Sequence, residues 1–429
     1  MSSVFSRRQE LPSEYISVGG VAVAANQCLA DSRFHTQIYT STPQSGFSNI
    51  MGNNVNYIDI AVKVPIDELR LLALEFNITN SGVTGTLELL PPHLWVGSNG
   101  IELRVDNNVI QQHYPESLQY DYELMTDSTR QIYADLCGNV YATTMMERNA
   151  SGTTPVGTLA PGASQYYYLP ITSSIFQVAK LPLCAVTSDI VYRFYFNQFN
   201  NVVASTSTAT ALTVTSLQLI LGGTVRGNAI DNTVNCAALN SDISASYYSP
   251  ERFTYNFGAQ VANAHLKATL NSLAGGLYSS LVIYARQQNA IQEQLSQWHY
   301  SATTYNPTNF AIQTATLNDQ SGRPYGVAST NANVTKYANI LMSNNNDQYL
   351  CSNFPDLFSY VKYSFGASNW VEFRNGQCCG LKLNNSWNYD IQLSNAFTNP
   401  STGVEVVYVG QRLYEARLLK SGRLVGVPQ

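Results

Sequence analysis

The sequence predicts a mainly β protein made of two tandem antiparallel β-barrels, with a few short helices in the connections. The chain has 429 residues, more than one hydrophobic core usually supports, so two units of about 200 residues are expected. Short apolar runs bounded by Gly, Asn, Pro or Ser recur along it, as in sandwiches and barrels. A weak internal repeat at an offset of about 208 residues supports a duplicated unit.

Charged residues are scarce. They make up 12% of the chain, against about 25% in a typical soluble domain, and 28 tyrosines are present. Interface cores are poor in charge and rich in aromatics, so this composition favours contact with protein partners; strand preference is a second, compatible explanation. The net charge of −5 and the pI near 5.6 argue against a protein that coats nucleic acid, and no sequence-specific nucleic-acid binding is expected.

β-Branched and alternating apolar residues mark the expected strands. In the first half these strands are Asn56–Val64, Leu69–Thr79, Gly85–Val96, Ile101–Gln112, Gln165–Ile171, Ile190–Phe199 and Ala211–Leu221. The Asn107-Asn108 pair predicts a hairpin turn within Ile101–Gln112, because Asn tolerates the left-handed conformation. In the second half the expected strands are Thr254–Val261, Leu266–Leu273, Leu277–Arg286, Phe310–Leu317, Tyr360–Phe365, Cys379–Asn384, Tyr389–Leu393 and Val404–Leu419.

Two segments with helical spacing interrupt the strands, Pro115–Cys137 and Lys336–Cys351. Between the halves, Leu221–Tyr248 is less periodic and opens with Gly222-Gly223, which we interpret as a turn at the domain boundary. The sequence therefore predicts an N-terminal arm over residues 1–20, a first domain over 21–223 and a second domain over 224–429.

The two halves of the chain resemble each other in the order of their elements more than in residue identity. At the offset of about 208 residues, Leu74 aligns with Val282 and Phe76 aligns with Tyr284. Ile101–Gln112 is a strand, a turn and a strand, and Phe310–Tyr325 has the same order about 210 residues later. Two copies of one eight-stranded antiparallel module explain this pattern, and the jelly roll is the commonest such module with long connections.

No catalytic, cofactor-binding or metal-ligating residue is predicted, and no cofactor is expected. None of the five histidines lies at ligand spacing to another: His35, His93, His113, His265 and His299. The pair His113 and Glu116 is better explained by the start of a helix than by a metal site. Cys378-Cys379 lack the second pair of a zinc site and are interpreted as strand thiols. Tyr166–Tyr168 lack interleaved basic residues, which favours strand and interface packing over base stacking.

Three segments resemble the double-jelly-roll major capsid proteins of tailless icosahedral double-stranded DNA viruses. Glu88–Gln112 has an apolar strand with Pro and Trp, an Ile-Glu strand and an Asn turn, and leads into the helix from Pro115. Tyr166–Phe196 has an aromatic-Leu-Pro strand, a Leu-Pro-Leu turn and an alternating strand. Ala274–Arg286 is similar to the early strand of the second barrel in that family.

The resemblance implies a non-enzymatic shell subunit. Three copies of two barrels would form a homotrimeric, pseudo-hexagonal capsomer that contacts neighbouring capsomers and minor capsid or vertex proteins in the virion. The subunit would be made in the host cytoplasm. The termini would point toward the virion interior, where a basic C-terminal tail would face an inner membrane or an inner protein. The basic residues of this tail are Arg412, Arg417, Lys420 and Arg423.

Two other functions stay open at this stage. One is a minor capsid protein of the same fold, and the other is a carbohydrate-binding or adhesive β-sandwich protein, which Tyr- and Asn-rich loops would support. An enzyme on a β scaffold ranks third, with no residues to nominate. Met1–Glu14 lacks the apolar core of a signal peptide, so we expect the seven cysteines to be reduced, cytosolic thiols.

Overall fold

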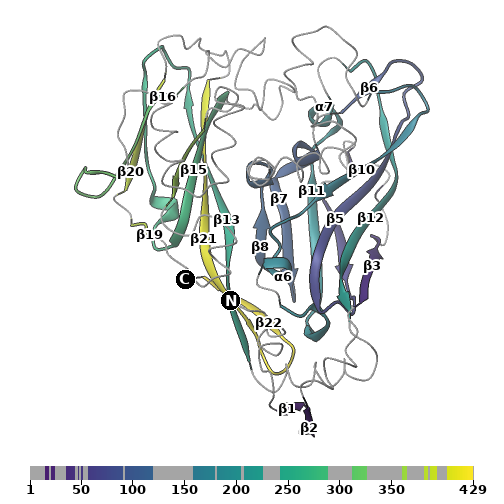
Figure 1. Cartoon of the computed structure of the whole chain (residues 1–429). Coiled ribbons are helices and arrows are strands. Elements are labelled where there is room, and N and C mark those ends of the chain that lie inside the picture. Colours follow the sequence, from purple (N-terminus) through teal and green to yellow (C-terminus); the bar gives the residue numbers. More distant parts are fainter. Residues whose placement is uncertain are drawn as a thin grey trace.

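Two groups of strands stand side by side in the molecule (Figure 1). The computed structural model describes residues 15–18, 21–24, 35–43, 47, 50–51, 57–89, 92–118, 158–178, 181–203, 207–225, 242–287, 312–325, 360–364, 381–384, 387–393 and 403–428. Of these, the backbone alone is described for residues 15–18, 21–24, 35, 93–94, 284–287, 312–315, 324–325, 360–364 and 381. A short hairpin of β1 (Tyr15–Val18) and β2 (Val21–Ala24) precedes the two groups.

The first group contains eight main strands in two antiparallel sheets, ordered β10-β5-β12-β3 and β4-β11-β7-β8. The strands are β3 (His35–Ser41), β4 (Tyr57–Val62), β5 (Glu68–Asn80), β7 (Val96–Val105), β8 (Asn108–His113), β10 (Ser164–Pro170), β11 (Ile190–Phe196) and β12 (Leu212–Val225). The connections hold β6 (Leu87–Glu88), which pairs with β9 (Thr158–Leu159), and the short helices η1 (Pro92–Trp95), α6 (Ile175–Val178), η2 (Leu183–Ala185) and α7 (Phe199–Val202).

The second group also forms two antiparallel sheets, ordered β13-β21-β15-β18 and β14-β20-β16-β17. The strands are β13 (Ile243–Gly258), β14 (His265–Thr269), β15 (Leu277–Gln287), β16 (Ile312–Asn318), β17 (Pro324–Tyr325), β18 (Tyr360–Ser364), β20 (Asn388–Leu393) and β21 (Val404–Leu418). A 3-10 turn, η3 (Asn271–Leu273), precedes β15, to which β19 (Leu381–Lys382) adds; β22 (Leu424–Pro428) adds to β21.

The two groups have the same topology. Taken in chain order, the eight main strands of each group occupy the same places in the two sheets, and this order is that of a jelly roll. The predicted fold class is therefore confirmed. In the sheet that holds β5, Leu74 pairs with Leu219, and in the sheet that holds β15, Val282 pairs with Val409. The predicted alignment of Leu74 with Val282 is wrong, because Leu74 points into the core, whereas in β15 the core-facing residue is Ile283, whose partner Tyr408 contacts Tyr389 of the opposite sheet.

Alternating burial explains why these segments form sheets. The pattern along β4 alternates exposed and buried residues, and β11 alternates buried and half-buried ones, so one side chain in two enters the core. An aromatic cluster fills the first jelly roll: the ring of Phe76 lies 5.3 Å from Trp95 and 5.8 Å from Phe196, and Trp95 lies 5.3 Å from Tyr167. Tyr167 is fully buried, which confirms strand packing for the Tyr166–Tyr168 segment.

Several strand ends differ from the sequence predictions. The segment Gly85–Val96 is not one strand, because η1 begins at Pro92, where proline fixes φ and cannot donate to a sheet. The hairpin turn lies one residue earlier than predicted, at Asp106 and Asn107, whose φ angles are 47° and 69°. Two other predicted strands end early and are followed by a short helix: the 3-10 helix η3 follows β14, and the α-helix α7 follows β11.

Gly222 and Gly223 do not form a turn, and this prediction is wrong. Both lie inside β12, which continues to Val225, and the register with β5 shifts between them. A Cβ atom on Gly223 would lie 2.3 Å from the carbonyl oxygen of Glu68 and 2.6 Å from Ile66 Cγ2. Glycine is therefore required here by the close approach of two backbones at a β-bulge. The division of the chain at residue 223 stays a prediction.

Both predicted helices fall largely outside the described residues. Residues 115–118 are helical, as expected for the start of Pro115–Cys137, whereas the rest of that segment and all of Lys336–Cys351 lie outside the description. Among the described helices, none has the length and apolar character needed to cross a membrane.

Candidate functional site: the junction between the two jelly rolls

The two jelly rolls share part of one hydrophobic core. The first residues of β13, the last residues of β21 and the first residue of β22 lie past the second jelly roll and pack with the core of the first (Figure 1). The buried residues that make this contact are Ala245, Tyr247, Tyr248, Leu413, Ala416, Leu418 and Leu424. Apolar burial at this shared core stabilises the placement of one jelly roll beside the other.

Hydrogen bonds connect the edge strand β8 of the first jelly roll to β13 of the second. The hydroxyl of Tyr247 donates to the carbonyl oxygen of Ile110 at 2.5 Å, and the backbone N–H of Gln112 donates to Ser249 Oγ at 3.3 Å. Gln111 is fully buried, and its Nε2 donates to the carbonyl oxygen of Ser173 at 2.7 Å. Buried donors and acceptors that satisfy each other in this way fix one geometry, because leaving them unpaired is costly.

Two carboxylates of the junction bind cations or hydroxyls from neighbouring strands. Glu116, which is 1% exposed, accepts from Arg252 Nε across the junction at 3.2 Å. Glu251 accepts from Arg412 Nη1 at 2.9 Å, from the Tyr414 hydroxyl and from the Tyr278 hydroxyl. Charge-assisted hydrogen bonds of this kind orient the strands that carry them.

The tyrosines around these carboxylates stay protonated over the physiological pH range. Burial raises the pKa of Tyr114 to about 12, and burial is also the first cause of the raised pKa values of Tyr278 and Tyr414. The neighbouring carboxylate of Glu251 raises the pKa values of Tyr278 and Tyr414 further, because it is negatively charged and accepts a hydrogen bond from each hydroxyl. Both hydroxyls therefore act as donors in the junction.

The basic C-terminal cluster is not a tail, and this prediction is wrong. Arg417 lies in β21, Lys420 and Arg423 lie at the following turn, and β22 pairs back on β21. The turn contacts the first jelly roll, where Thr187 N–H donates to the carbonyl oxygen of Gly422 at 2.8 Å. Gly422 has a φ of 78°, and a Cβ atom there would lie 2.6 Å from Thr187 Cγ2.

Most of these cations face a carboxylate of the chain. Arg412 pairs with Glu251, as described above. Arg417 pairs with Glu415 at 2.9 Å, and Arg423 lies 3.7 Å from Asp106 of the first jelly roll. The side chains of Arg417 and Arg423 are 54% and 59% exposed, so both remain accessible to a partner.

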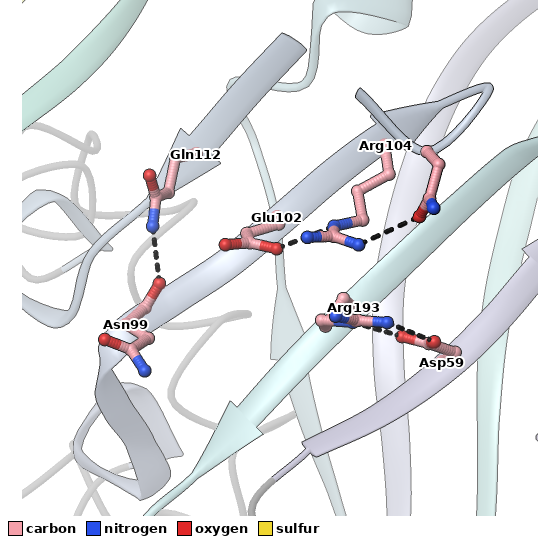
Figure 2. A network of polar contacts seen from close by, with 7 residues as sticks. Asp59, Asn99, Glu102, Arg104, Gln112 and Arg193 are labelled. Carbon is pink, nitrogen blue, oxygen red and sulfur yellow. Dashed lines mark hydrogen bonds and ion pairs between the residues drawn. The ribbon is translucent and has the colours of Figure 1, made fainter. Parts of the chain in front are cut away.

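Ion pairs also cover the outer face of the β4-β11-β7-β8 sheet (Figure 2). Arg193 of β11 donates to both carboxylate oxygens of Asp59 on β4 at 2.7 Å, and Arg104 Nε donates to Glu102 on β7 at 2.9 Å. Partly exposed pairs of this kind contribute up to about 1 kcal/mol each. The charges of this face are therefore neutralised within the chain.

His113, the last residue of β8, is fully buried, and burial lowers its pKa from 6.5 to about 4. Between these two pH values the unfolded chain binds more protons than the folded one, so stability falls as the pH drops from 6.5 to 4. We expect the loss from this residue to reach about 3 kcal/mol. Unfolding of His113→Gln at pH 7 and pH 4 should show a smaller difference than the parent shows.

The half-exposed His265 provides the matched control, because its ring stays in contact with solvent. The His265→Gln variant should retain the acid destabilisation that His113→Gln loses. Equal pH dependence in the parent and in His113→Gln would contradict the assignment to His113.

Side chains typical of catalytic or metal sites do not converge in the part of the chain that the structure describes. No group of three or more His, Cys, Asp or Glu residues there could hold a metal ion. Cys184 is half-buried and not part of a disulfide, and its Sγ–H donates to Asp67 Oδ1 at 3.4 Å. Cys378-Cys379 and His299 lie outside the described residues.

Sequence reasoning missed the first half of β13, which supplies most of the junction. Tyr247, Ser249 and Glu251 alternate along this strand, so period-two spacing was present from Ala245 onward. Ser249 and Glu251 are polar and Tyr248, at an intervening position, is a large aromatic residue, which weakened that signal, and Pro250 argued against a strand.

Solved structures of known proteins share the fold of this chain. The chain has the double-jelly-roll fold of major capsid proteins of icosahedral viruses, which matches over about nine-tenths of its length. No known protein family matches the sequence, and no curated protein is significantly similar to it.

Three solved structures illustrate the likeness. PBCV-1 VP54, fitted into a reconstruction of the virophage Sputnik, is 14% identical with a TM-score of 0.62, covering 92% of this chain and 97% of that chain. A chain in the structure of the Sputnik virophage is 13% identical, with a TM-score of 0.59 and coverage of 92% and 88%. The Faustovirus major capsid protein is 9% identical, with a TM-score of 0.54 and coverage of 90% of each chain.

Proposed function

We propose that this chain is a major capsid protein that forms homotrimeric, pseudo-hexagonal capsomers and, through them, an icosahedral virion shell. The observation that carries the proposal is the repeated eight-strand topology, held side by side by a buried junction. Its likeness to major capsid proteins over most of the chain supports the same role. The role is structural and non-enzymatic, and its working surfaces are large interfaces between subunits.

The oligomeric state tests this proposal. Light scattering on the purified chain should give a mass of three times 47.2 kDa that persists on dilution. Obligate interfaces of shell subunits are large and apolar, which is why the trimer should survive dilution. A dilution-stable monomer would contradict it, and sugar affinity of that monomer would favour the carbohydrate-binding alternative. A minor capsid role would instead give sub-stoichiometric incorporation into particles.

The same proposal places the β21–β22 turn toward the virion interior. β22 lies at one end of the molecule, and β6 and α7 lie at the other (Figure 1). Arg417, Lys420 and Arg423 are exposed at the β22 end, where they would face an inner membrane. Arg412 is held by Glu251 and is left out of this surface.

Vesicle sedimentation tests the membrane contact. The trimer should bind vesicles containing anionic lipid, and a variant with Glu at Arg417, Lys420 and Arg423 should lose most of that binding at about 0.15 M salt. A matched variant with Glu at Lys63, an exposed residue of the first jelly roll, should bind as the parent does. Equal binding by both variants would contradict the membrane contact.

A further inference from the structure

His113 ends β8, the strand of the first jelly roll that meets β13 at the junction. Its side chain is 1% exposed, and it pairs with the core residue Ile101 of β7, so the ring points to the interior. Nδ1 lies 3.4 Å from Ser173 Oγ, in the connection between β10 and α6. Nε2 is buried without a hydrogen-bond partner in the described part of the chain. The site therefore suits the neutral ring, because a proton on the ring would bury an unpaired N–H and a charge.

The charged groups around the end of β8 do not compensate a proton on His113. The charged residues that β7, the helical turn 115–118 and β13 bring to this end all act on the pKa of the adjacent Tyr114: Arg252, Glu251, Glu116 and Glu102. The connection 171–174 carries no titratable residue. Tyr192 of β11 stays neutral, because burial raises its pKa, and it bonds to Ser174 Oγ at 2.7 Å. Burial alone lowers the pKa of His113, so none of the described carboxylates favours the charged ring.

The strand that holds this ring also holds the junction. Gln111 Nε2 donates to the carbonyl oxygen of Ser173 at 2.7 Å and lies 3.5 Å from that of Tyr248 on β13. The N–H of Gln112 donates to Ser249 Oγ, as described above. The ring of His113 reaches water only when the end of β8 leaves Ser173, and that movement breaks the contacts of both glutamines with β13.

We propose that His113 is a pH-sensitive switch: its protonation releases the end of β8 from Ser173 and from β13, so that acid loosens the junction between the two jelly rolls. The switch works within one chain and goes beyond the proposed shell role. In the released state the ring regains a pKa near 6.5, against about 4 in the closed state. Release is therefore favoured as the pH falls, and its equilibrium constant should rise about 20-fold from pH 7 to pH 5.

Hydrogen exchange of the full chain tests the switch, because it reports openings that are too rare to see otherwise. Two amides report the end of β8: that of Gln112, and that of Ile175, which donates to Gln111 Oε1 at 2.8 Å. After correction for the intrinsic pH dependence of exchange, the protection of both should fall about 20-fold from pH 7 to pH 5. The amide of Leu270, which donates to the carbonyl oxygen of Trp387 in the second jelly roll, should keep its protection.

Three variants assign the effect. His113→Gln should make the protection of the Ile175 amide independent of pH, whereas His265→Gln, changed at a half-exposed ring, should behave as the parent does. Ser249→Ala removes the acceptor that β13 offers to β8. It should lower the protection of Ile175 about 5-fold at pH 7, the effect of one ordinary hydrogen bond.

Several results would overturn the switch. The same pH dependence in His113→Gln as in the parent would do so. The parent alone decides as well, should that variant not fold: unchanged protection at Gln112 and Ile175, or an equal loss at Leu270, would show that acid does not open this site selectively. Unchanged protection of Ile175 in Ser249→Ala would separate the release of β8 from the junction. None of these measurements depends on the oligomeric state, so the proposed shell role stands or falls separately.

Discussion

Replacing Tyr247 by Ala should destabilise the chain by about 3–5 kcal/mol, the range for truncating a large buried aromatic side chain. Tyr247 is fully buried where the two jelly rolls share a core, and its ring stacks on Tyr414 at 5.5 Å. Its hydroxyl donates to Ile110 across the junction, so the variant loses packing and a hydrogen bond together. Chemical denaturation of parent and variant measures the difference in the free energy of unfolding.

Two further variants divide this effect into its parts. Tyr247→Phe keeps the ring and should lose only about 1 kcal/mol, from the hydrogen bond to Ile110. Tyr166→Ala removes a tyrosine that is 52% exposed, and its cost should stay below about 1 kcal/mol. If Tyr247→Ala were no more destabilising than Tyr166→Ala, the shared core would not stabilise the chain.

The second large effect is expected from Gly223→Ala. The added methyl group would lie 2.3 Å from the carbonyl oxygen of Glu68, a backbone atom that moves only if β5 shifts against β12. Forcing atoms into a packed site costs about 1–3 kcal/mol or more, and a clash with backbone belongs at the upper end. A thermal melt should therefore show a drop in Tm of several degrees or failure to fold.

Gly97→Ala is the matched control for this change. A Cβ atom on Gly97 would lie 3.5 Å from the nearest atoms of Phe196, an ordinary contact, and Gly97 also lies in a strand. Its melt should stay close to that of the parent. Equal melts for the two alanine variants would show that β5 and β12 do not approach each other as closely as described.

Much of the fold could be predicted because its strands obey simple periodicity. β4 and β11 alternate between core and outer face, and each was predicted within a few residues of its end. The order of elements in the two halves predicted the duplicated jelly roll. That prediction succeeded because topology is preserved by the repeat even where the residues differ.

Other features depend on contacts that no local pattern records. A glycine pair commonly marks a turn, but Gly222 and Gly223 are required by the approach of β5 to β12, which are more than a hundred residues apart in the chain. The basic residues after Arg412 resembled a solvated tail because the carboxylate nearest to Arg423 is distant in the sequence. This carboxylate, Asp106, belongs to the other jelly roll.

The junction fixes the two jelly rolls in one arrangement. The second jelly roll places Ser249 and Tyr247 against β8, where hydrogen bonds join the two units.

Electron microscopy of the purified particle tests the central claim most directly. The account predicts single particles of three chains whose end-on averages show six lobes, one for each jelly roll, in a pseudo-hexagonal outline. The lobes should alternate in two kinds around the ring, because the first and second jelly rolls differ. Averages with two lobes and no higher assembly would contradict the account.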